Sequence, residues 1–388
     1  MAPVDSVPVD PLAGKRLLFV VNEARFLVSH RGALLAEARR RGMQLIVICG
    51  ARTGEAELEA QGIEVQPIRL TRSAIEPWNE LTSYRRLVAL YQSLEPDICH
   101  HVTIKPVIYG TRAAQVARVP AVVNAIPGMG FVFIRRGMLA NARRWLVNLL
   151  YRYALRHPNM RVIFQNSEDR DGFFENRLVP RDRAVLIRGS GVDLTLYPEP
   201  APPVGPVTFV LVGRMLNHKG VTEFVRAAQI LCQDYPEWRF LLVGDVDPGN
   251  PSSLTTEQLE HWRRKGIIDW LGFHDDVPEL LREAHVVVLP SYREGLPKTL
   301  LEASAAGRPM IATDVPGCRE VIRDGMNGIL VPPRDPIALA NAMRRLGNSR
   351  DDRHRMGRAA RVRAEALYNV DDVVRDTFLV YEQLLARA

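Results

Sequence analysis

The chain of 388 residues has no long apolar run and no recognisable secretory leader. None of its apolar stretches approaches the roughly 18 to 20 residues that a membrane-spanning helix needs, so any membrane contact is expected to be peripheral. Residues 1–14 are rich in proline and carry no apolar core region, which predicts a disordered tail and not a signal peptide.

Cysteine and acidic residues are also in short supply. The four cysteines are far apart and form no C-x-x-C pair, which argues against a disulfide framework and a zinc site and favours a reduced, cytoplasmic setting. Asp and Glu number 44 against 51 Lys and Arg, so the net charge is +7. This excess favours an anionic partner, and charge alone does not choose among nucleic acid, acidic lipid and a phosphorylated ligand.

The sequence does contain a regular alternation of short, β-branched apolar runs with longer segments of helical pattern. This alternation predicts an α/β protein with two doubly wound, Rossmann-like parallel sheets that face each other across a cleft. Strands are expected at 16–21, 44–49, 64–70, 97–102, 120–126, 160–166, 207–213, 239–244, 267–272, 285–290, 308–313 and 327–332. The expected units are a first domain at 15–195, a Pro-rich linker at 196–206, a second domain at 207–370 and a terminal helix at 371–388 that packs back on the first domain.

A strand exit, a tight loop and a helix start follow one another in REGLPKTLLEAS, residues 293–304. Gly295 and Pro297 turn the chain, and Pro297 lies close to the first helical position, where its missing N–H is not needed. A helix start leaves backbone N–H groups unpaired and carries a positive partial charge. The backbone from Leu296 to Thr299 therefore suits a phosphate.

A second cationic element, GRMLNHKG (213–220), follows the first strand of the second domain. Arg214 and Lys219 leave that strand end just before a helix. Because parallel strands end at one edge of a sheet, both cations are expected to share a cleft with Glu294 and Glu302. Two cations suit a diphosphate and two carboxylates suit sugar hydroxyls, which together indicate a nucleotide sugar; the alternative for the cations is a pair of solvated loop charges.

These segments, with the later GRPMIATDVPGCREVI and DGMNGILVPPRDP, resemble glycosyltransferase family 4, whose members are retaining enzymes of the two-domain GT-B fold. The resemblance implies a carboxy-terminal domain that binds the nucleotide-sugar donor and an amino-terminal domain that binds the acceptor. It implies that Glu294 contacts the donor sugar, that Glu302 contacts the ribose, and that Arg214 and Lys219 grip the diphosphate beside Gly213. No metal and no other cofactor is then expected.

The sequence DVDP (245–248) has the form of a D-x-D metal motif. A turn built from Asp and Pro at a strand end is the simpler interpretation, and we favour it.

The first domain resembles the subgroup that adds amino sugars to undecaprenyl-diphosphate-linked acceptors. The resemblance rests on NEARFLVSHRGALLAEA, HHVTIKPVIYGTRAA, VNAIPGMGFVF and FQNSEDRDGF. The residues that it implies for the acceptor side are His30, Arg31, His100, Lys105 and Gly128. Adjacent residues of a strand point to opposite sides, so one of His100 and His101 is expected to face the cleft, and His101 is favoured as the catalytic one.

The segment 133–157 carries six arginines and no acid, together with leucines and aromatic residues. This pattern is typical of a helix that lies on an anionic lipid surface, and an ordinary packing helix with arginines on its wet face is the alternative. The residues expected to meet the lipid are Arg135, Arg136, Arg143, Arg144 and Trp145. No nucleic-acid recognition module accompanies the charge, so nucleic acid is not an expected partner.

The resemblance and the charge predict a retaining transfer of GlcNAc or GalNAc from a UDP-sugar to a polyprenyl-diphosphate-linked acceptor. The expected setting is peripheral, at the cytoplasmic face of the inner membrane, in bacterial surface-glycan or glycoprotein oligosaccharide assembly. Two other functions stay open. One is a nucleotide-sugar 2-epimerase or hydrolase on the same architecture, and the other is a non-catalytic peripheral membrane protein that binds a sugar nucleotide.

Overall fold

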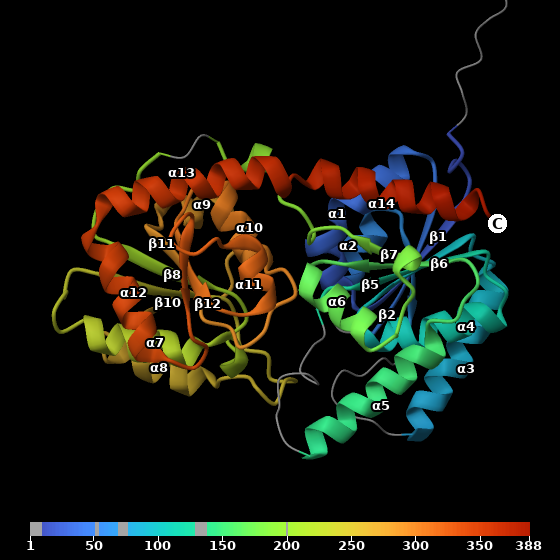
Figure 1. The fold of residues 1–388 in the computed structure, drawn as a ribbon, viewed down its shortest axis with the longest axis horizontal. Helices are drawn as coiled ribbons and strands as arrows, with labels where there is room; N and C mark the ends of the chain where they lie inside the picture. Colours follow the sequence, from blue (N-terminus) through green and yellow to red (C-terminus); the bar gives the residue numbers. More distant parts are fainter. Residues whose placement is uncertain (1–9, 51–53, 69–76, 129–137, 199–200) are drawn as a thin grey trace, which may run out of the picture.

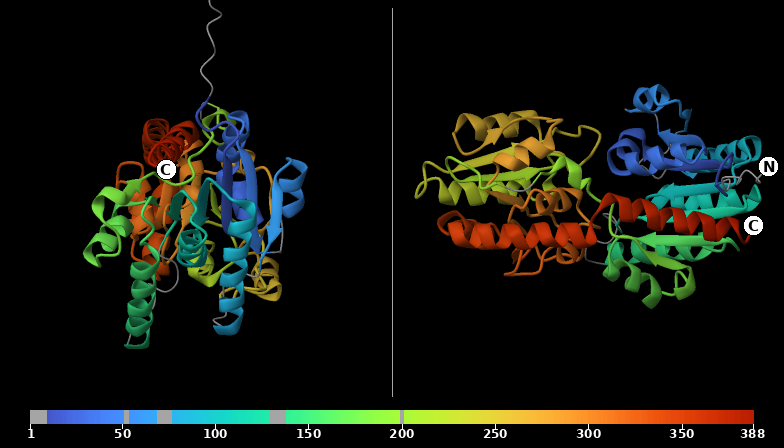
Figure 2. Two further views of the ribbon diagram at one scale, coloured as in Figure 1. Left: turned by 90° about the vertical axis from the view of Figure 1, so that its right-hand side faces the viewer. Right: turned by 90° about the horizontal axis from the view of Figure 1, so that it is seen from above.

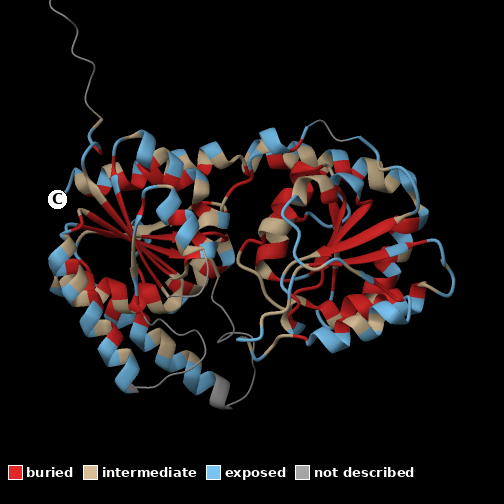
Figure 3. Ribbon diagram, turned by 180° about the vertical axis from the view of Figure 1, so that it is seen from behind, coloured by how far each residue is buried: buried red, intermediate tan, exposed pale blue. Residues whose placement is uncertain are grey.

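The computed structural model describes residues 10–50, 54–68, 77–128, 138–198 and 201–388, which form two α/β domains side by side (Figure 1). Each domain has one parallel sheet with helices on both faces, so the strands are buried and read as apolar runs (Figure 3). The predicted architecture of two Rossmann-like parallel-sheet domains is confirmed.

The amino-terminal sheet has seven strands in the order β3-β2-β1-β4-β5-β6-β7. They are β1 (Arg16–Glu23), β2 (Gln44–Gly50), β3 (Glu64–Pro67), β4 (Ile98–Val102), β5 (Ala121–Ile126), β6 (Met160–Phe164) and β7 (Ala184–Leu186). The helices are α1 (Ala24–Arg40), α2 (Glu55–Ala60), α3 (Pro77–Leu94), α4 (Thr111–Val116), α5 (Met138–Ala154) and α6 (Ser167–Glu175), with a π-helical turn at Pro106–Gly110. The strand order reverses between β1 and β4, which is where such sheets bind ligands at their carboxyl edge.

The carboxy-terminal sheet repeats this order with six strands, β10-β9-β8-β11-β12-β13. They are β8 (Thr208–Val212), β9 (Arg239–Val243), β10 (Asp269–Trp270), β11 (Val286–Leu289), β12 (Met310–Thr313) and β13 (Gly328–Val331). The helices are α7 (Val221–Leu231), α8 (Thr256–Arg264), α9 (Val277–Glu283), α10 (Lys298–Ala305), α11 (Pro316–Val321), α12 (Pro336–Asn348), α13 (Arg350–Leu367) and α14 (Val370–Leu385). Here the order reverses between β8 and β11.

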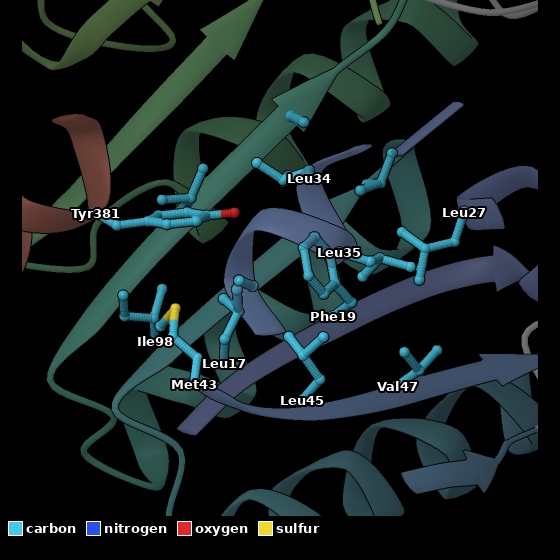
Figure 4. Packing of buried hydrophobic residues seen from close by; sticks show 14 of the residues in the cluster. Leu17, Phe19, Leu27, Leu34, Leu35, Met43, Leu45, Val47, Ile98 and Tyr381 are labelled. Carbon is cyan, nitrogen blue, oxygen red and sulfur yellow. The ribbon is translucent and has the colours of Figure 1, made fainter. Parts of the chain in front are cut away.

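The last helix, α14, leaves the carboxy-terminal domain and packs on the amino-terminal sheet (Figures 1 and 2). Its Phe378 and Tyr381 are buried in the same apolar cluster as Leu17 and Phe19 of β1. Figure 4 shows Tyr381 in this cluster with Leu17 and Phe19. Burial of two large aromatic side chains is worth several kcal/mol, of order 3 each, so the end of the chain is part of the first domain's core.

The chain crosses between the domains twice, and the two crossings hydrogen-bond to each other. Val192 donates its N–H to the Tyr368 carbonyl at 2.8 Å, and Val370 donates to the Val192 carbonyl at 3.1 Å. Gly191 lies beside them at φ +70°, where a Cβ would come within 2.5 Å of the Val370 Cα. The two crossings therefore form a paired hinge between the domains.

Two sequence-based expectations differ from the structure. Strand β10 has only two residues in place of the six expected at 267–272. Leu12 is fully buried in the first core, so the part of the predicted tail at 10–14 is ordered; residues 1–9 lie outside the described residues. Across the described ranges, no helix has both the length and the apolarity to cross a membrane.

Candidate active site

The loop after β8 brings Lys219 against the loop after β11. Gly220 has φ +76° at the start of α7, and a Cβ there would lie 2.1 Å from the Pro290 carbonyl oxygen, so only glycine allows this approach. As a result, the Lys219 ammonium lies 2.6 Å from the Glu294 carboxylate. The candidate diphosphate cation and the candidate donor-sugar carboxylate are thus brought together at the switch point.

Arg214 stands at the same sheet edge and is partly exposed. Its guanidinium contacts the Asp247 carboxylate at 2.7 Å, and the backbone of the next residue, Met215, donates to the Asp245 carbonyl at 2.9 Å. The other acid of DVDP, Asp245, accepts from the Phe273 N–H at 3.0 Å. Within the described residues, no three His, Cys, Asp or Glu side chains cluster as metal ligands would, and Asp247 serves as the partner of Arg214.

Helix α10 begins at this edge with Pro297 as its N-cap residue. The Thr299 hydroxyl donates to the Val212 carbonyl at 3.2 Å, which ties the helix start to the end of β8, directly before Gly213. Leu296 is buried behind the loop. The start of α10 consequently lies at the same sheet edge as Lys219 and Glu294, in a position that suits an anion.

Glu302 lies further along α10 and is almost fully buried. Its carboxylate is 3.2 Å from the Lys298 ammonium. Burial raises the pKa of Glu302, while the Lys298 charge opposes that rise. The two residues line a pocket of about 220 Å³ that is shared by α1, residues 190–197, α10 and α14.

His30 and Arg31 line this pocket from the amino-terminal domain. The His30 ring stacks on Phe26 and lies 2.7 Å from the Ser29 hydroxyl, and burial lowers its pKa to about 3, so it is neutral at physiological pH. Arg31 is buried and donates to the Gly189 carbonyl at 3.2 Å. Arg31 therefore supports the hinge segment as well as the pocket.

The other two acceptor-side candidates lie apart from that pocket. Lys105 follows β4 and is 2.5 Å from the carboxylate of Glu80 in α3. Gly128 follows β5 and touches the opposite domain, where a Cβ on Gly128 would come within 3.1 Å of the Gly295 Cα. Gly128 and Gly295 thus mark a close backbone contact between the loop after β5 and the loop after β11.

The prediction that His101 faces the cleft is wrong. His101 is fully buried on the α3 and α4 side of the sheet, and its ring nitrogens meet the Tyr91 hydroxyl at 3.0 Å and the Asn124 side-chain oxygen at 2.8 Å. The proposed acceptor contact by His100 is also wrong. His100 stacks on Phe19, lies 2.6 Å from the Tyr381 hydroxyl and is covered by α14. Both histidines alternate as expected, but helices cover both faces.

Four polar residues near the cleft were not predicted from the sequence. At the reversal point of the first sheet, Asn22 near the end of β1 donates to the hydroxyl of Thr103, which directly follows β4, at 2.7 Å. Thr103 has φ +80°, a strained conformation for a β-branched residue that often marks a functional site. Asn166 and Asp169, at the start of α6, contact the Glu294 loop. The sequence could have identified these residues, because each lies at a strand end or within FQNSED.

Helix α5 leaves several apolar side chains in solvent. Trp145 is 67% exposed and Tyr153 is 52% exposed, and the leucines between them are also exposed. In α3, Trp78 is 82% exposed, and both helices extend from the body of the domain in the same direction (Figure 2). Arg143 is exposed and Arg144 is half-buried, whereas Arg135 and Arg136 lie outside the described residues.

Comparison with known proteins identifies the protein family that this chain matches. Residues 16–167 match the model of the "Glycosyl transferase 4-like" family, and residues 206–349 match that of "Glycosyl transferases group 1". Among solved structures, Anabaena Alr3699/HepE in complex with UDP aligns with a TM-score of 0.75 at 20% identity over 95% of this chain and 100% of that one. WaaG, a glycosyltransferase involved in lipopolysaccharide biosynthesis, aligns with a TM-score of 0.71 at 16% identity over 92% and 98%.

Two curated relatives match over most of their length. The Campylobacter jejuni N,N'-diacetylbacillosaminyl-diphospho-undecaprenol alpha-1,3-N-acetylgalactosaminyltransferase is 25% identical over 95% of this chain and 99% of its own. The Escherichia coli UDP-Gal:alpha-D-GlcNAc-diphosphoundecaprenol alpha-1,3-galactosyltransferase is 27% identical over 68% and 70%. With a glycosyl transferase 4-like domain followed by a group 1 domain, this chain belongs to the glycosyltransferases of the GT-B fold.

Proposed function

We propose that the chain is a retaining glycosyltransferase of family 4 that moves GlcNAc or GalNAc from a UDP-sugar to a polyprenyl-diphosphate-linked acceptor. The observation that carries the proposal is the contact of Lys219 with Glu294 at 2.6 Å beside the start of α10. A fixed cation and a helix start suit a leaving diphosphate, and the adjacent carboxylate suits the sugar hydroxyls.

The choice of acceptor rests on the two curated relatives. Both are named for acceptors in which a sugar is linked through diphosphate to undecaprenol, and both are named for α linkages. Nucleotide donors of the UDP-galactose kind carry their sugar in the α configuration, so an α product keeps the configuration of the donor. The relatives therefore support a lipid-linked acceptor and a retaining reaction for this chain.

The proposed reaction needs one bond broken and one formed. The bond from the anomeric carbon to the phosphate oxygen breaks, and the acceptor hydroxyl bonds to the same face of that carbon. The hydroxyl proton passes to the departing phosphate oxygen. Lys219, Arg214 and the α10 start stabilise the charge that develops on the diphosphate, which is usually the largest catalytic term. We assign no covalent nucleophile, and fixed cations take the place that a divalent ion has in other enzymes.

We further propose that the chain works as a peripheral protein at the cytoplasmic face of the inner membrane. Helix α5 has no acid, exposes Trp145 and Tyr153, and carries arginines that suit an anionic lipid surface. Helix α3, with the exposed Trp78, extends beside it. Lys105 pairs with Glu80 of α3, and the π-helical turn that follows Lys105 packs on both α3 and α5. An acceptor phosphate held by Lys105 would therefore lie beside the two helices that we assign to the lipid surface.

The test is incubation of the protein with a panel of UDP-, GDP- and ADP-sugars and undecaprenyl-diphosphate-linked mono- and disaccharides. A UDP-amino sugar paired with one of these lipids should give a longer lipid-linked glycan. An α linkage in the product, read by nuclear magnetic resonance, supports retention, and a β linkage would contradict it. Turnover of the sugar nucleotide without lipid would favour an epimerase or hydrolase, and UDP binding without any turnover would favour a non-catalytic protein.

A further inference from the structure

Glu294 stands between two residues that the opposite domain holds. The Arg293 guanidinium lies 2.5 Å from the Asp169 carboxylate, and the Gly295 carbonyl accepts a hydrogen bond from the Asn166 side-chain amide at 2.7 Å. Asn166 and Asp169 belong to the start of α6 in the amino-terminal domain. The residue that we assign to the donor sugar is therefore fixed on both sides by the domain that we assign to the acceptor.

The two holding residues are locked to each other. The Asn166 side chain accepts from the Asp169 N–H at 2.7 Å and donates to the Asp169 carboxylate at 3.0 Å, and both side chains are almost fully buried. Burial raises the pKa of Asp169, and the Arg293 charge opposes the rise. A buried ion pair contributes little net stability compared with apolar packing. The role of the pair between Asp169 and Arg293 is therefore better explained by the position in which it holds Arg293.

The backbones of the two domains also touch at this point. A Cβ on Gly295 would lie 1.4 Å from the Pro127 carbonyl oxygen, and one on Gly317 would lie 2.4 Å from the Gly295 carbonyl oxygen. The loop that carries Glu294 is thus enclosed between the β5 exit and the start of α11. A shift of α6 would move this loop, because Asn166 and Asp169 at the start of α6 are bonded to the residues on either side of Glu294.

We propose that Asn166 and Asp169 are positioning residues, whose contacts with Gly295 and Arg293 set where Glu294 lies when the two domains meet. The inference rests on the proposed glycosyl transfer. We assign neither residue a contact with substrate. They align the donor-sugar contact with the acceptor side, so transfer is efficient only when α6 and the Glu294 loop are joined as they are in this structure.

The chain offers a matched control in the same helix. Glu168 is next to Asp169 and also pairs across the domains, with Arg319 at 2.9 Å. Both side chains of that pair are exposed, at 56% and 40%, and neither is adjacent to Glu294 in the chain. An exposed pair is worth about 0 to 1 kcal/mol, so its removal leaves the loop in place.

The test compares Asp169→Asn with Glu168→Gln in the full-length protein, using the donor and acceptor pair that the wild type accepts. Asp169→Asn should lower kcat by about tenfold or more while the Kd for UDP stays within about twofold, because the nucleotide site is intact. Glu168→Gln should change both by less than about twofold. Arg293→Gln should change kcat and the Kd for UDP as Asp169→Asn does. The kcat of the variant that carries both substitutions should be no lower than that of either single variant.

Unchanged kcat in Asp169→Asn, or equal losses of kcat and UDP affinity, would overturn the inference. If Asp169→Asn does not fold, as judged by thermal unfolding, Asn166→Ser and Arg293→Lys give the same comparison. Small-angle X-ray scattering adds a readout that needs no turnover: Asp169→Asn should have a larger radius of gyration than the wild type, and Glu168→Gln should not. If the wild type elongates no lipid-linked acceptor, the proposed function is wrong. If all variants have the same radius of gyration as the wild type, the positioning role is wrong.

Discussion

At the scale of single residues, the contact between Lys219 and Glu294 joins the two charges that the proposed reaction needs. Lys219→Ala should lower the transfer rate by about a hundredfold or more, because a fixed cation no longer stabilises the leaving diphosphate. Glu294→Gln should lose more in transfer than in affinity for UDP, because its carboxylate meets the sugar and not the nucleotide. Steady-state kinetics and calorimetric titration with UDP measure the two quantities.

Lys265→Ala is the control for this comparison, since Lys265 is an exposed lysine after α8 and far from the switch point in the chain. It should leave transfer and UDP binding unchanged. Near-normal transfer by Lys219→Ala would remove the diphosphate assignment, and equal losses of transfer and UDP affinity in Glu294→Gln would count against the sugar contact.

The sequence was informative about some residues and not about others for a physical reason. Lys219 and Glu294 each follow a strand, and parallel strands end at one edge, so their proximity could be predicted. His101 also ends a strand, but its side depends on which helices cover the sheet. Tyr91 and Asn124, which hold its ring, belong to other elements, 10 and 23 residues away, and nothing in the sequence identifies them as its partners.

At the scale of elements, the buried histidines of β4 make stability depend on pH. Burial lowers the pKa of His101 to about 4 from its ordinary 6.5, so the unfolded chain takes up a proton first as the pH falls. The stabilising effect of neutral His101 is complete above about pH 6.5 and is lost as the pH falls from there toward about 4. By about pH 5 the loss from this one group is about 2 kcal/mol.

Urea unfolding at about pH 8 and about pH 5 measures this dependence. His101→Gln should lose about 2 kcal/mol less between the two conditions than the wild type does, because glutamine does not titrate. His261→Gln, in exposed α8, should keep the dependence of the wild type. If all three proteins lose the same free energy of unfolding between the two pH values, His101 is not the titrating group.

Helix α5 and helix α3 support a second prediction at this scale. Trp145→Ala should weaken binding to vesicles that contain an anionic phospholipid by about tenfold, because a buried indole contributes about 1.5 to 3 kcal/mol at a lipid surface. Co-sedimentation with vesicles measures it. Val362→Ala on α13 removes a side chain of similar exposure, 65% against 67%, and should have no effect. Equal binding by both variants would favour an ordinary packing role for α5.

At the scale of the whole molecule, the two domains could be predicted from the sequence, whereas their joint could not. Each domain repeats one strand order, which local periodicity and right-handed crossovers largely determine. The hinge depends on a contact between Val192 and Val370, which are far apart in the chain. The terminal helix was expected to pack on the first domain, but which residues it meets there is equally non-local, since its apolar face, with Phe378 and Tyr381, fits any core that it could reach.

Gly191 tests whether this paired hinge holds the domains together. Gly191 and Gly205 both have positive φ, +70° and +99°, so an alanine at either position costs about 1 to 2 kcal/mol of backbone strain. A Cβ at Gly205 meets no atom within 4 Å, whereas one at Gly191 comes within 2.5 Å of the Val370 Cα and must push the start of α14 away. Gly191→Ala should therefore lower the free energy of unfolding by about 2 kcal/mol more than Gly205→Ala does.

Calorimetry gives a second readout of the same substitution. The unfolding transition of Gly191→Ala should broaden or separate into two, because α14 leaves the second domain through this hinge and packs on the first. Equal, single transitions for the two variants would mean that the crossings do not couple the domains.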